Sequence, residues 1–382
     1  MSLILDSHRK YLSDIPRVTA FRKAIEEVVK PGDTVVDLGS GTGILGLLAC
    51  RAGASRVYSL EATAIIGLAR KIAADNGYAD RICFLRGLST RLELPERVDI
   101  VLTDQIGRLG FEAGIFEYFG DAIRRFLKPG GRLIPSALKL CMAPVTSRDN
   151  WEENQFWLRE PAGFNFQAAS GIANNTGYPV HLNPEQLLSK PAVACSVDLH
   201  NLDPDSWIGS ATFEIEQPGD LHGLGGWFEA QLSPSVTMTN SPLAADRINR
   251  RNVFLPIARP VSVAPGDIVR AKIRVVPSEV TASWSVTVET GVLSGNPARQ
   301  RFSHSTLLGM LLSQEDLDKT RPASVPKLTA WGEARRSILE LVDGRRPLAE
   351  IEIEMLKRHP DLFPSLKQAA VYVAEVVTRY TV

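Results

Sequence analysis

The pattern of hydrophobic and polar positions changes once along the chain, at about residue 137, and predicts two kinds of sheet. Before this point, short continuous apolar runs alternate with segments whose apolar residues recur at helical spacing. Repeated strand and helix units of this kind predict a parallel sheet covered by helices. The expected elements are helices over residues 13–29, 44–51, 71–76 and 116–127, the last ending at KPGG, and strands that end at Val36 or cover residues 56–60, 82–86 and 98–103.

After residue 137, apolar residues recur at every second position in short runs, as is typical of antiparallel strands. Residues 151–178 follow neither period and are rich in aromatic side chains, so we expect them to leave the sheet and pack on a partner surface. Helical spacing returns after the linker RPASVPK. The expected strands cover residues 193–199, 211–215, 226–232, 268–276 and 282–287, and the late helices cover residues 337–342, 348–356 and 366–377.

A glycine-rich turn follows the first predicted strand, in the sequence DLGSGTG. Asp37 precedes Gly39, Gly41 and Gly43, and the missing Cβ atoms let the backbone approach a ligand. A dinucleotide fingerprint needs its third glycine one position later, where this chain has isoleucine, which disfavours a nicotinamide cofactor. The next strand ends at Glu61, where a carboxylate can accept hydrogen bonds from two ribose hydroxyls. The pattern favours S-adenosylmethionine.

Composition and charge narrow the class of protein. The chain has 382 residues, of which 44% are hydrophobic, enough for two or three packed domains. Basic and acidic residues both number 43, so the chain lacks the basic excess expected of a nucleic-acid-binding protein. The four cysteines form no C-x-x-C pair and predict free thiols in a reducing compartment rather than a metal site. With no signal peptide and no apolar run of about 18 residues, we expect a cytoplasmic protein without a membrane partner.

Several separate segments resemble the protein arginine methyltransferase family, over roughly residues 5–310. His8, Asp14 and Arg17 fit the family's H-x-x-x-x-x-D-x-x-R helix, and VVDLGSGTGILGLLACRAGASRVYSLE is similar to its cofactor motif. The segments LNPEQLL, VDL and LHGLGGWF resemble pieces of its barrel domain. The resemblance implies an S-adenosylmethionine-dependent enzyme that releases S-adenosylhomocysteine.

The resemblance also implies an α/β architecture in a fixed order. A Rossmann-like class I methyltransferase domain over residues 1–136 would be followed by an antiparallel β-barrel domain over residues 137–320. An arm at about residues 148–182 of the barrel domain would make a head-to-tail homodimer. Residues 328–382 form a small α-rich module outside this resemblance; it is either a helical cap on the barrel or a domain similar to the PqqD-like proteins, which hold peptide precursors.

Carried over residue by residue, the cofactor motif assigns specific contacts. Arg17 would pair with the cofactor carboxylate, and Glu61 would hold the ribose. Each assignment has a plainer alternative: Arg17 as a solvated helix charge, His8 as a surface residue, and the adenine-site residues as caps of a loop. The full predicted cofactor set is Arg17, Asp37, Gly39, Gly41, Gly43, Glu61, Ser89 and Thr90.

The acceptor side departs from the family pattern. The family uses a loop with two glutamates, S-E-x-x-G-x-x-x-x-x-x-E, to bind a guanidinium. Here the first becomes Asp104 and the second becomes Ala113, with Glu112 one residue early. The family's T-H-W segment becomes Ile248-Asn249-Arg250. We predict Asp104 and Glu112 as catalytic residues, the latter only if the loop shifts.

Charge decides what these departures mean for the acceptor. A guanidinium next to Arg108, Arg250 or Arg251 would be repelled, whereas a negatively charged acceptor would gain hydrogen bonds from them. The alternative is that Arg250 and Arg251 point to solvent. We predict Arg108, Asn249 and Arg250 as substrate residues, for methylation of a nitrogen or oxygen of a small molecule or peptide. A true protein arginine N-methyltransferase and a catalytically silent cofactor-binding scaffold are the alternatives.

Overall fold

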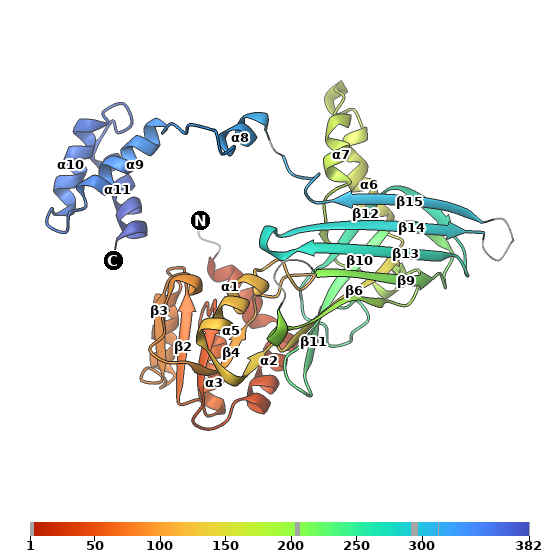
Figure 1. The fold of residues 1–382 in the computed structure, drawn as a ribbon, viewed down its shortest axis with the longest axis horizontal. Coiled ribbons are helices and arrows are strands. Elements are labelled where there is room, and N and C mark those ends of the chain that lie inside the picture. The colour runs from red at the N-terminus through yellow and green to blue at the C-terminus, as the bar shows by residue number, and fades with distance from the viewer. Residues whose placement is uncertain (1–3, 203–206, 292–296, 312, 382) are drawn as a thin grey trace. The chain divides into compact units, whose positions relative to one another are not determined.

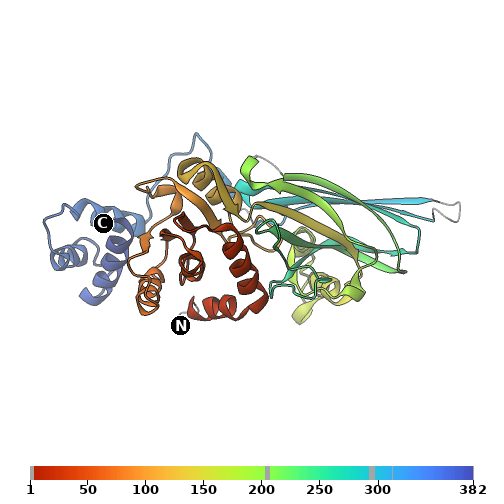
Figure 2. The same ribbon diagram turned by 90° about the horizontal axis from the view of Figure 1, so that it is seen from below.

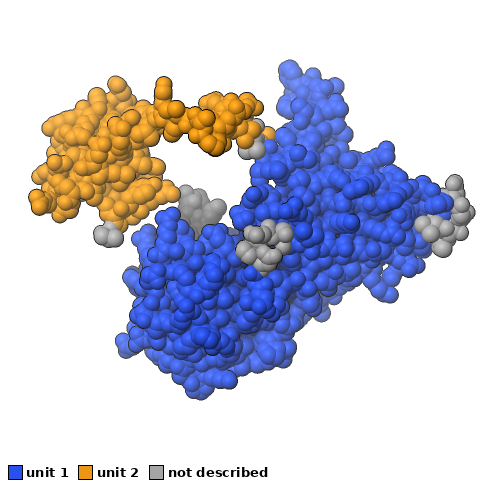
Figure 3. Space-filling view, in the orientation of Figure 1, with its two compact units in different colours: residues 1–310 blue, residues 311–382 orange. Residues whose placement is uncertain are grey.

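The chain folds as two compact units, residues 1–310 and 311–382 (Figure 3). The computed structural model describes residues 4–202, 207–291, 297–311 and 313–381. Each unit has a hydrophobic core of its own. The predicted domain limits at residues 136 and 320 remain predictions, and the division between the units falls at residues 310 and 311.

The first unit begins with a five-stranded parallel sheet in the order β3-β2-β1-β4-β5 (Figure 1). The strand order reverses between β1 and β4, and open α/β sheets bind ligands outside the carboxyl ends of such a strand pair. The strands are β1 (Thr34–Leu38), β2 (Arg56–Glu61), β3 (Ile82–Arg86), β4 (Val98–Thr103) and β5 (Leu127–Ile134). The helices are α1 (Ile4–Ser13), α2 (Ile15–Val28), α3 (Ile44–Ala52), α4 (Ile66–Asp75) and α5 (Gly120–Phe126), with a π-helical turn, η2 (Ile115–Phe119), before α5.

Strand β5 lies where the sequence predicts a helix end and a turn. Pro129 is tolerated because β5 is an edge strand, and Gly130 takes a φ of 72° beside an irregularity in the pairing with β4. Ion pairs fix the strand: Lys128 contacts Asp99 of β4, and Arg132 contacts Asp33. These tertiary contacts outweigh the local preference of the KPGG sequence for a turn.

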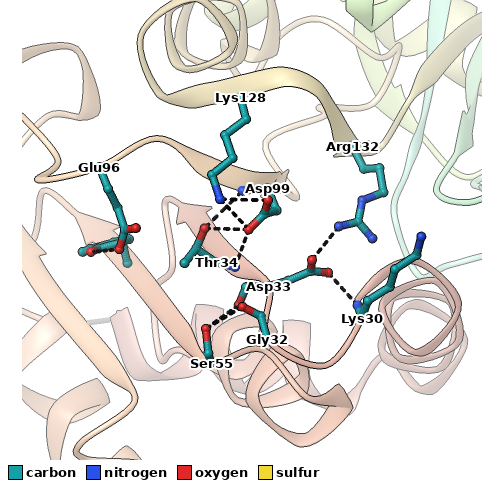
Figure 4. Close-up of polar contacts among 10 residues, drawn as sticks. Lys30, Gly32, Asp33, Thr34, Ser55, Glu96, Asp99, Lys128 and Arg132 are labelled. Atoms are coloured by element: carbon teal, nitrogen blue, oxygen red, sulfur yellow. Dashed lines mark hydrogen bonds and ion pairs between the residues drawn. The ribbon is translucent and has the colours of Figure 1, made fainter.

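A group of polar contacts joins three strands at the amino end of the parallel sheet (Figure 4). Asp99 accepts hydrogen bonds at 2.9 Å from both the backbone N–H and the hydroxyl of Thr34, the first residue of β1. The ammonium of Lys128 lies 2.9 Å from both carboxylate oxygens of Asp99. Although partial burial raises the pKa of Asp99, the hydrogen bonds from Thr34 and Lys128 outweigh it and hold that pKa below its usual value.

Asp99→Ala is therefore expected to lower the free energy of unfolding by about 1–3 kcal/mol, because it leaves the Thr34 and Lys128 donors without this acceptor. A depressed carboxyl pKa stabilises the fold above the unfolded-state value of about 4, and this stabilisation is lost as the pH falls. Urea titrations at pH 7 and pH 4 measure both effects, with Asp80→Ala in an exposed turn as the control. Equal midpoints for both variants at pH 7 would contradict the expectation.

The rest of the first unit consists mainly of two antiparallel sheets, whose strands run alongside each other (Figure 2). They pack face to face, and Trp284 of the smaller sheet donates a hydrogen bond to the carbonyl of Pro256 in the larger one (3.1 Å). The larger sheet has the order β7-β12-β10-β6-β8, with β11 on β10, and contains β6 (Ala137–Val145), β7 (Tyr178–Val180), β8 (Ala192–Asp198), β10 (Gly219–Gln231), β11 (Thr237–Thr239) and β12 (Asn252–Val263). The smaller has the order β15-β14-β13-β9 and contains β9 (Trp207–Glu214), β13 (Ile268–Val276), β14 (Thr281–Thr290) and β15 (Ala298–Ser305).

The segment between β6 and β7 forms short helices instead of strands. The main ones are α6 (Arg148–Asn154) and α7 (Ser170–Ala173), with 3-10 turns between them. Trp151 anchors the segment, because its indole N–H donates to the carbonyl of Ile257 (3.1 Å). Phe156, Phe164 and Phe166 are exposed, and the role of this segment as a dimerisation arm remains a prediction.

The second unit is a small helical module built from α8 (Gln314–Lys319), α9 (Ala330–Leu341), α10 (Leu348–Arg358) and α11 (Leu366–Tyr380). Helix α9 begins seven residues before its predicted start, because the Thr329 side chain caps it by accepting from the N–H of Gly332. Among the described residues, no helix is long and apolar enough to cross a membrane. All four cysteines are free; Cys83 is half-buried and the other three are buried.

Candidate functional site

The glycine turn connects β1 to α3 at the carboxyl end of the parallel sheet. Gly39, Gly41 and Gly43 have φ values of 67°, 55° and 84°, a left-handed region that favours glycine. Asp37, fully buried in β1, holds the turn by accepting a hydrogen bond from the N–H of Gly46 in α3 (3.1 Å). Burial raises the pKa of Asp37 to about 7, even though this hydrogen bond lowers it.

Two side chains lie against the glycine turn. A Cβ atom added at Gly41 would lie 2.6 Å from Cε1 of His8, on α1. One added at Gly39 would lie 2.8 Å from Nε2 of Gln105, which follows β4. The structure therefore brings His8 to the turn, where the sequence left its role open. Gln105 was not predicted from the sequence. It could have been, because it lies just beyond β4, which pairs with β1.

Glu61 ends β2 beside the same turn. Its carboxylate accepts hydrogen bonds from the N–H of Gly41 (3.1 Å) and the N–H of Thr63 (2.8 Å). The side chain is only half-buried, so it remains accessible to a ligand. Ser89 and Thr90 belong to the 3-10 turn η1 (Ser89–Arg91) after β3, the strand paired with β2. These residues share the carboxyl end of the sheet with the glycine turn.

Arg17 and Asp104 form a buried ion pair that joins α2 to the loop after β4. The side chains are 8% and 11% exposed, and Arg17 donates from both Nε (2.7 Å) and Nη2 to one oxygen, Oδ2. Asp14 caps α2 by accepting from the N–H of Arg17, and the guanidinium lies 4.8 Å from the ring centre of Tyr11. Arg17, predicted to pair with a cofactor carboxylate, thus contacts an acceptor-loop carboxylate in this structure.

The two acidic residues of the acceptor loop have different surroundings. Asp104 Oδ1 is buried and has no hydrogen-bond partner among the described residues. Glu112 instead folds back on its own loop, where its carboxylate accepts from the backbone N–H groups of Arg108 (3.1 Å), Leu109 (2.9 Å) and Phe111 (3.3 Å). A catalytic role for Glu112 would require the loop to give up these bonds, so it remains a prediction.

The barrel contributes a second arginine to Asp104. Arg250 is 14% exposed; its Nη2 lies 3.4 Å from Asp104 Oδ2, and its Nη1 donates to the carbonyl of Gly107 (2.9 Å). Arg251 is exposed and donates to the carbonyl of Pro179, so one of the two adjacent arginines faces solvent. Arg108 is exposed as well, and the structure shows no side-chain contact from it to Asp104.

Two buried asparagines, which no pattern in the sequence predicts, connect the barrel to the acceptor loop. The Asn240 amide donates to the carbonyls of Arg108 (3.1 Å) and Arg251 (3.0 Å). The Asn252 amide donates to the carbonyl of Asn240 (2.6 Å) and accepts from the N–H of Leu182 (3.0 Å). This chain of amides fixes the loop that carries Arg250. Asn249 also lies there, exposed, and its N–H donates to Asp14 (2.8 Å).

Two family models match successive parts of the first unit. Residues 21–140 match the model described as ribosomal protein L11 methyltransferase. Residues 137–288 match the model described as the arginine methyltransferase oligomerization subdomain. The two matches meet close to residue 137, where the hydrophobic pattern of the sequence changes.

Named relatives and a solved structure agree with these matches. Probable protein arginine N-methyltransferase 6 of Arabidopsis thaliana is 28% identical over 235 residues, 59% of this chain and 54% of the relative, so the chain spans about half of that protein. Arginine N(omega)-methyltransferase of Streptomyces achromogenes subsp. streptozoticus is 28% identical over 275 residues, 70% of this chain and 75% of the relative. In fold, the chain is similar to the Trypanosoma brucei PRMT1 enzyme-prozyme heterotetrameric complex with AdoHcy, with a TM-score of 0.69 and 20% identity over 78% of this chain and 97% of that one.

Proposed function

We infer the function of this chain from its place among the protein arginine methyltransferase-like, class I S-adenosylmethionine-dependent methyltransferases, to which it belongs. We propose that it transfers a methyl group from S-adenosylmethionine to a nitrogen or oxygen of a small molecule or peptide that carries its own negative charge. The observation that carries the proposal is the position of Arg250, 3.4 Å from Asp104.

The cofactor part of the proposal rests on the glycine turn and the groups around it. Because positions 39 and 41 lack a Cβ atom, the side chains of Gln105 and His8 lie directly against the turn that the amino acid end of a ligand would approach. Glu61, half-buried at the end of β2, can exchange its backbone hydrogen bonds for those of ribose hydroxyls. S-adenosylmethionine supplies an activated methyl group, and the protein contributes by holding the acceptor in line with it.

The acceptor part of the proposal follows from the charge around Asp104. Arg17 and Arg250 already contact its Oδ2 atom, so two guanidinium groups face one carboxylate. A third guanidinium from a substrate arginine would be repelled by both, and the repulsion is stronger in a partly buried site than in water. An acceptor with a carboxylate or phosphate would instead be attracted. Asp104 Oδ1, which is buried and has no partner among the described residues, can then accept a hydrogen bond from the nucleophile or take up its proton.

The names of the relatives favour two kinds of acceptor. The Arabidopsis relative is named for protein arginine, which supports the second candidate, a true protein arginine N-methyltransferase. The Streptomyces relative is named for arginine itself, which is a precedent for an acceptor that is not a protein. A catalytically silent, cofactor-binding scaffold is the alternative from another functional class. We propose a cytoplasmic location, in line with the free cysteines.

Labelled-methyl assays on glycine-arginine-rich peptides and on small organic acids of a cell extract test the proposal. We expect turnover on the peptides to stay well below about 0.01 per second, a rate that corresponds to a barrier of roughly 20 kcal/mol. Methylated product from the small-acid fraction would support the proposal. Peptide turnover at or above about 0.01 per second would favour a protein arginine methyltransferase, and no product from any fraction would favour the scaffold.

We also propose that the chain forms a homodimer through the arm, in line with the match to an oligomerization subdomain. Aromatic side chains dominate many interfaces, and Phe164 on the arm is 68% exposed. The double variant Phe156→Asp/Phe164→Asp is expected to be monomeric in light scattering at micromolar concentration, because two charges would be buried in the contact. Ile208→Asp, at a 65% exposed position on β9, is the matched control and should remain dimeric. A monomeric wild type would contradict the proposal.

A further inference from the structure

A cavity of about 210 Å³ lies in the first unit, directly beside Arg250. Apart from Ile248, its lining is polar, and none of the described lining residues is acidic. At roughly 30 Å³ per water-sized group, the cavity has room for about seven such groups, which suits part of a small molecule. The polar lining residues are His181, Asn240, Arg247, Asn249, Arg250 and Asn252.

Hydrogen bonds within the chain hold the wall of the cavity in place. Asn240 and Asn252 are 1% and 2% exposed. The Asn240 amide donates to the carbonyl of Arg108 in the acceptor loop, and the Asn252 amide donates to the backbone carbonyl of Asn240. Arg247 is held at the cavity because its Nη1 donates to the carbonyl of Leu182 (3.2 Å). A site whose groups are already positioned loses less entropy when a ligand binds.

Several hydrogen-bond donors of the lining are uncommitted. Within the described part of the chain, Arg247 has no carboxylate partner, and its guanidinium uses one N–H group of five. The side chains of His181 and Asn249 have no hydrogen-bond partner among the described residues. Three side chains at one small cavity can thus donate to the same ligand.

The charge around the cavity favours an anion. Arg247 and Arg250 are the cations among the described lining residues, and Arg250 shares the carboxylate of Asp104 with Arg17. Asp246, the neighbour of Arg247 in the sequence, is not among the residues that line the cavity. Among the described residues Arg247 forms no ion pair, so its guanidinium charge is available to an anionic ligand. Arginine binds carboxylates and phosphates through two parallel hydrogen bonds.

We propose that this cavity binds the oxyanion group of the methyl acceptor. Arg247 would be the main residue that holds the oxyanion, and His181 and Asn249 would donate further hydrogen bonds to it. The acceptor is then a small molecule whose carboxylate or phosphate lies in the cavity, while its nucleophilic atom reaches Asp104 past Arg250. The inference rests on the proposed function for the identity of the ligand, but the oxyanion site can be tested without turnover.

Equilibrium dialysis of the full chain against radiolabelled succinate and radiolabelled inorganic phosphate, at constant ionic strength, tests the site. We expect one saturable site per chain and at least a tenfold loss of affinity in Arg247→Gln, with partial recovery in Arg247→Lys. Arg251→Gln removes the same charge from an exposed neighbour that does not line the cavity, so its affinity should change less than twofold. Arg247 is itself exposed, so its substitution should not unfold the chain, which the melting temperature verifies.

Each outcome of the dialysis has a definite meaning. Binding of succinate alone assigns a carboxylate acceptor, and binding of phosphate alone assigns a phosphorylated one. The absence of saturable binding, or equal losses in Arg247→Gln and Arg251→Gln, overturns the site. Calorimetry with S-adenosylhomocysteine separates the two proposals. If the wild type binds S-adenosylhomocysteine but neither succinate nor phosphate, only the proposed oxyanion site is wrong. If the wild type does not bind S-adenosylhomocysteine, the proposed methyltransferase function is overturned.

Discussion

Asp104→Asn should lower methyl transfer at least about 100-fold, which corresponds to a barrier about 2.7 kcal/mol higher, while S-adenosylhomocysteine still binds. Within the part of the chain that the structure describes, Asp104 Oδ1 is buried and has no hydrogen-bond partner, whereas Glu112 is committed to backbone N–H groups. The substitution also frees Arg17 from its ion pair, so cofactor affinity should be equal to or higher than that of the wild type. Single-turnover assays with labelled S-adenosylmethionine measure the first effect, and calorimetry measures the second.

A loss of activity could also arise from damage to the fold, since Asp104→Asn leaves two partly buried guanidinium groups without their carboxylate. Asp33→Asn is the matched control, because Asp33 also pairs with an arginine, Arg132 (2.7 Å), but at the opposite end of the sheet. The control should keep nearly full transfer with a similar change in melting temperature. Asp104→Asn with more than a tenth of wild-type transfer would rule out Asp104 as the essential carboxylate.

Gly41→Ala is expected to weaken S-adenosylhomocysteine binding at least tenfold. With a φ of 55°, a residue other than glycine costs roughly 1–2 kcal/mol at this position, and the new Cβ would displace the ring of His8. Gly77→Ala separates these two effects, because Gly77 has a φ of 76° but nothing within 4 Å of an added Cβ. Both variants should lose stability in thermal melts, and only Gly41→Ala should lose affinity in calorimetry. Equal affinities would mean that the turn does not contact the ligand.

The parts of the site that local sequence determines could be predicted. The order of Asp37, Gly39, Gly41 and Glu61 follows from one strand, turn and helix unit. Glu61 ends β2 as predicted, whereas β1 continues to Leu38, two residues beyond its predicted end. The pair of Arg17 and Asp104 could not be predicted, because its members are 87 positions apart in the sequence and only the tertiary fold brings α2 to the loop after β4. Nor does the sequence show that Glu112 closes its own loop, because that depends on the direction of three backbone N–H groups.

A similar distinction separates antiparallel strands with one buried face from those that are buried on both faces. Strand β13 alternates buried and exposed residues, and its predicted limits at residues 268 and 276 are those observed. Strand β10 has eight consecutive buried residues from Leu221 to Phe228, because both of its faces are covered. Alternation of apolar and polar residues therefore indicates only its last part, which was predicted as residues 226–232. β12, which begins with six buried residues, was missed for the same reason.

The amides of Asn240 and Asn252 limit how descendants of this chain can diverge. The Asn252 side chain donates to the backbone carbonyl of Asn240, and the Asn240 side chain donates to the backbone carbonyls of Arg108 and Arg251. If either asparagine mutates to an apolar residue, these carbonyls lose their donor, at a cost of about 1–3 kcal/mol for a buried group. Because every acceptor is a backbone group, a second substitution at the other asparagine cannot restore the lost bond. Among related sequences, each asparagine is therefore expected to be kept independently, even in lineages that change the rest of the acceptor loop.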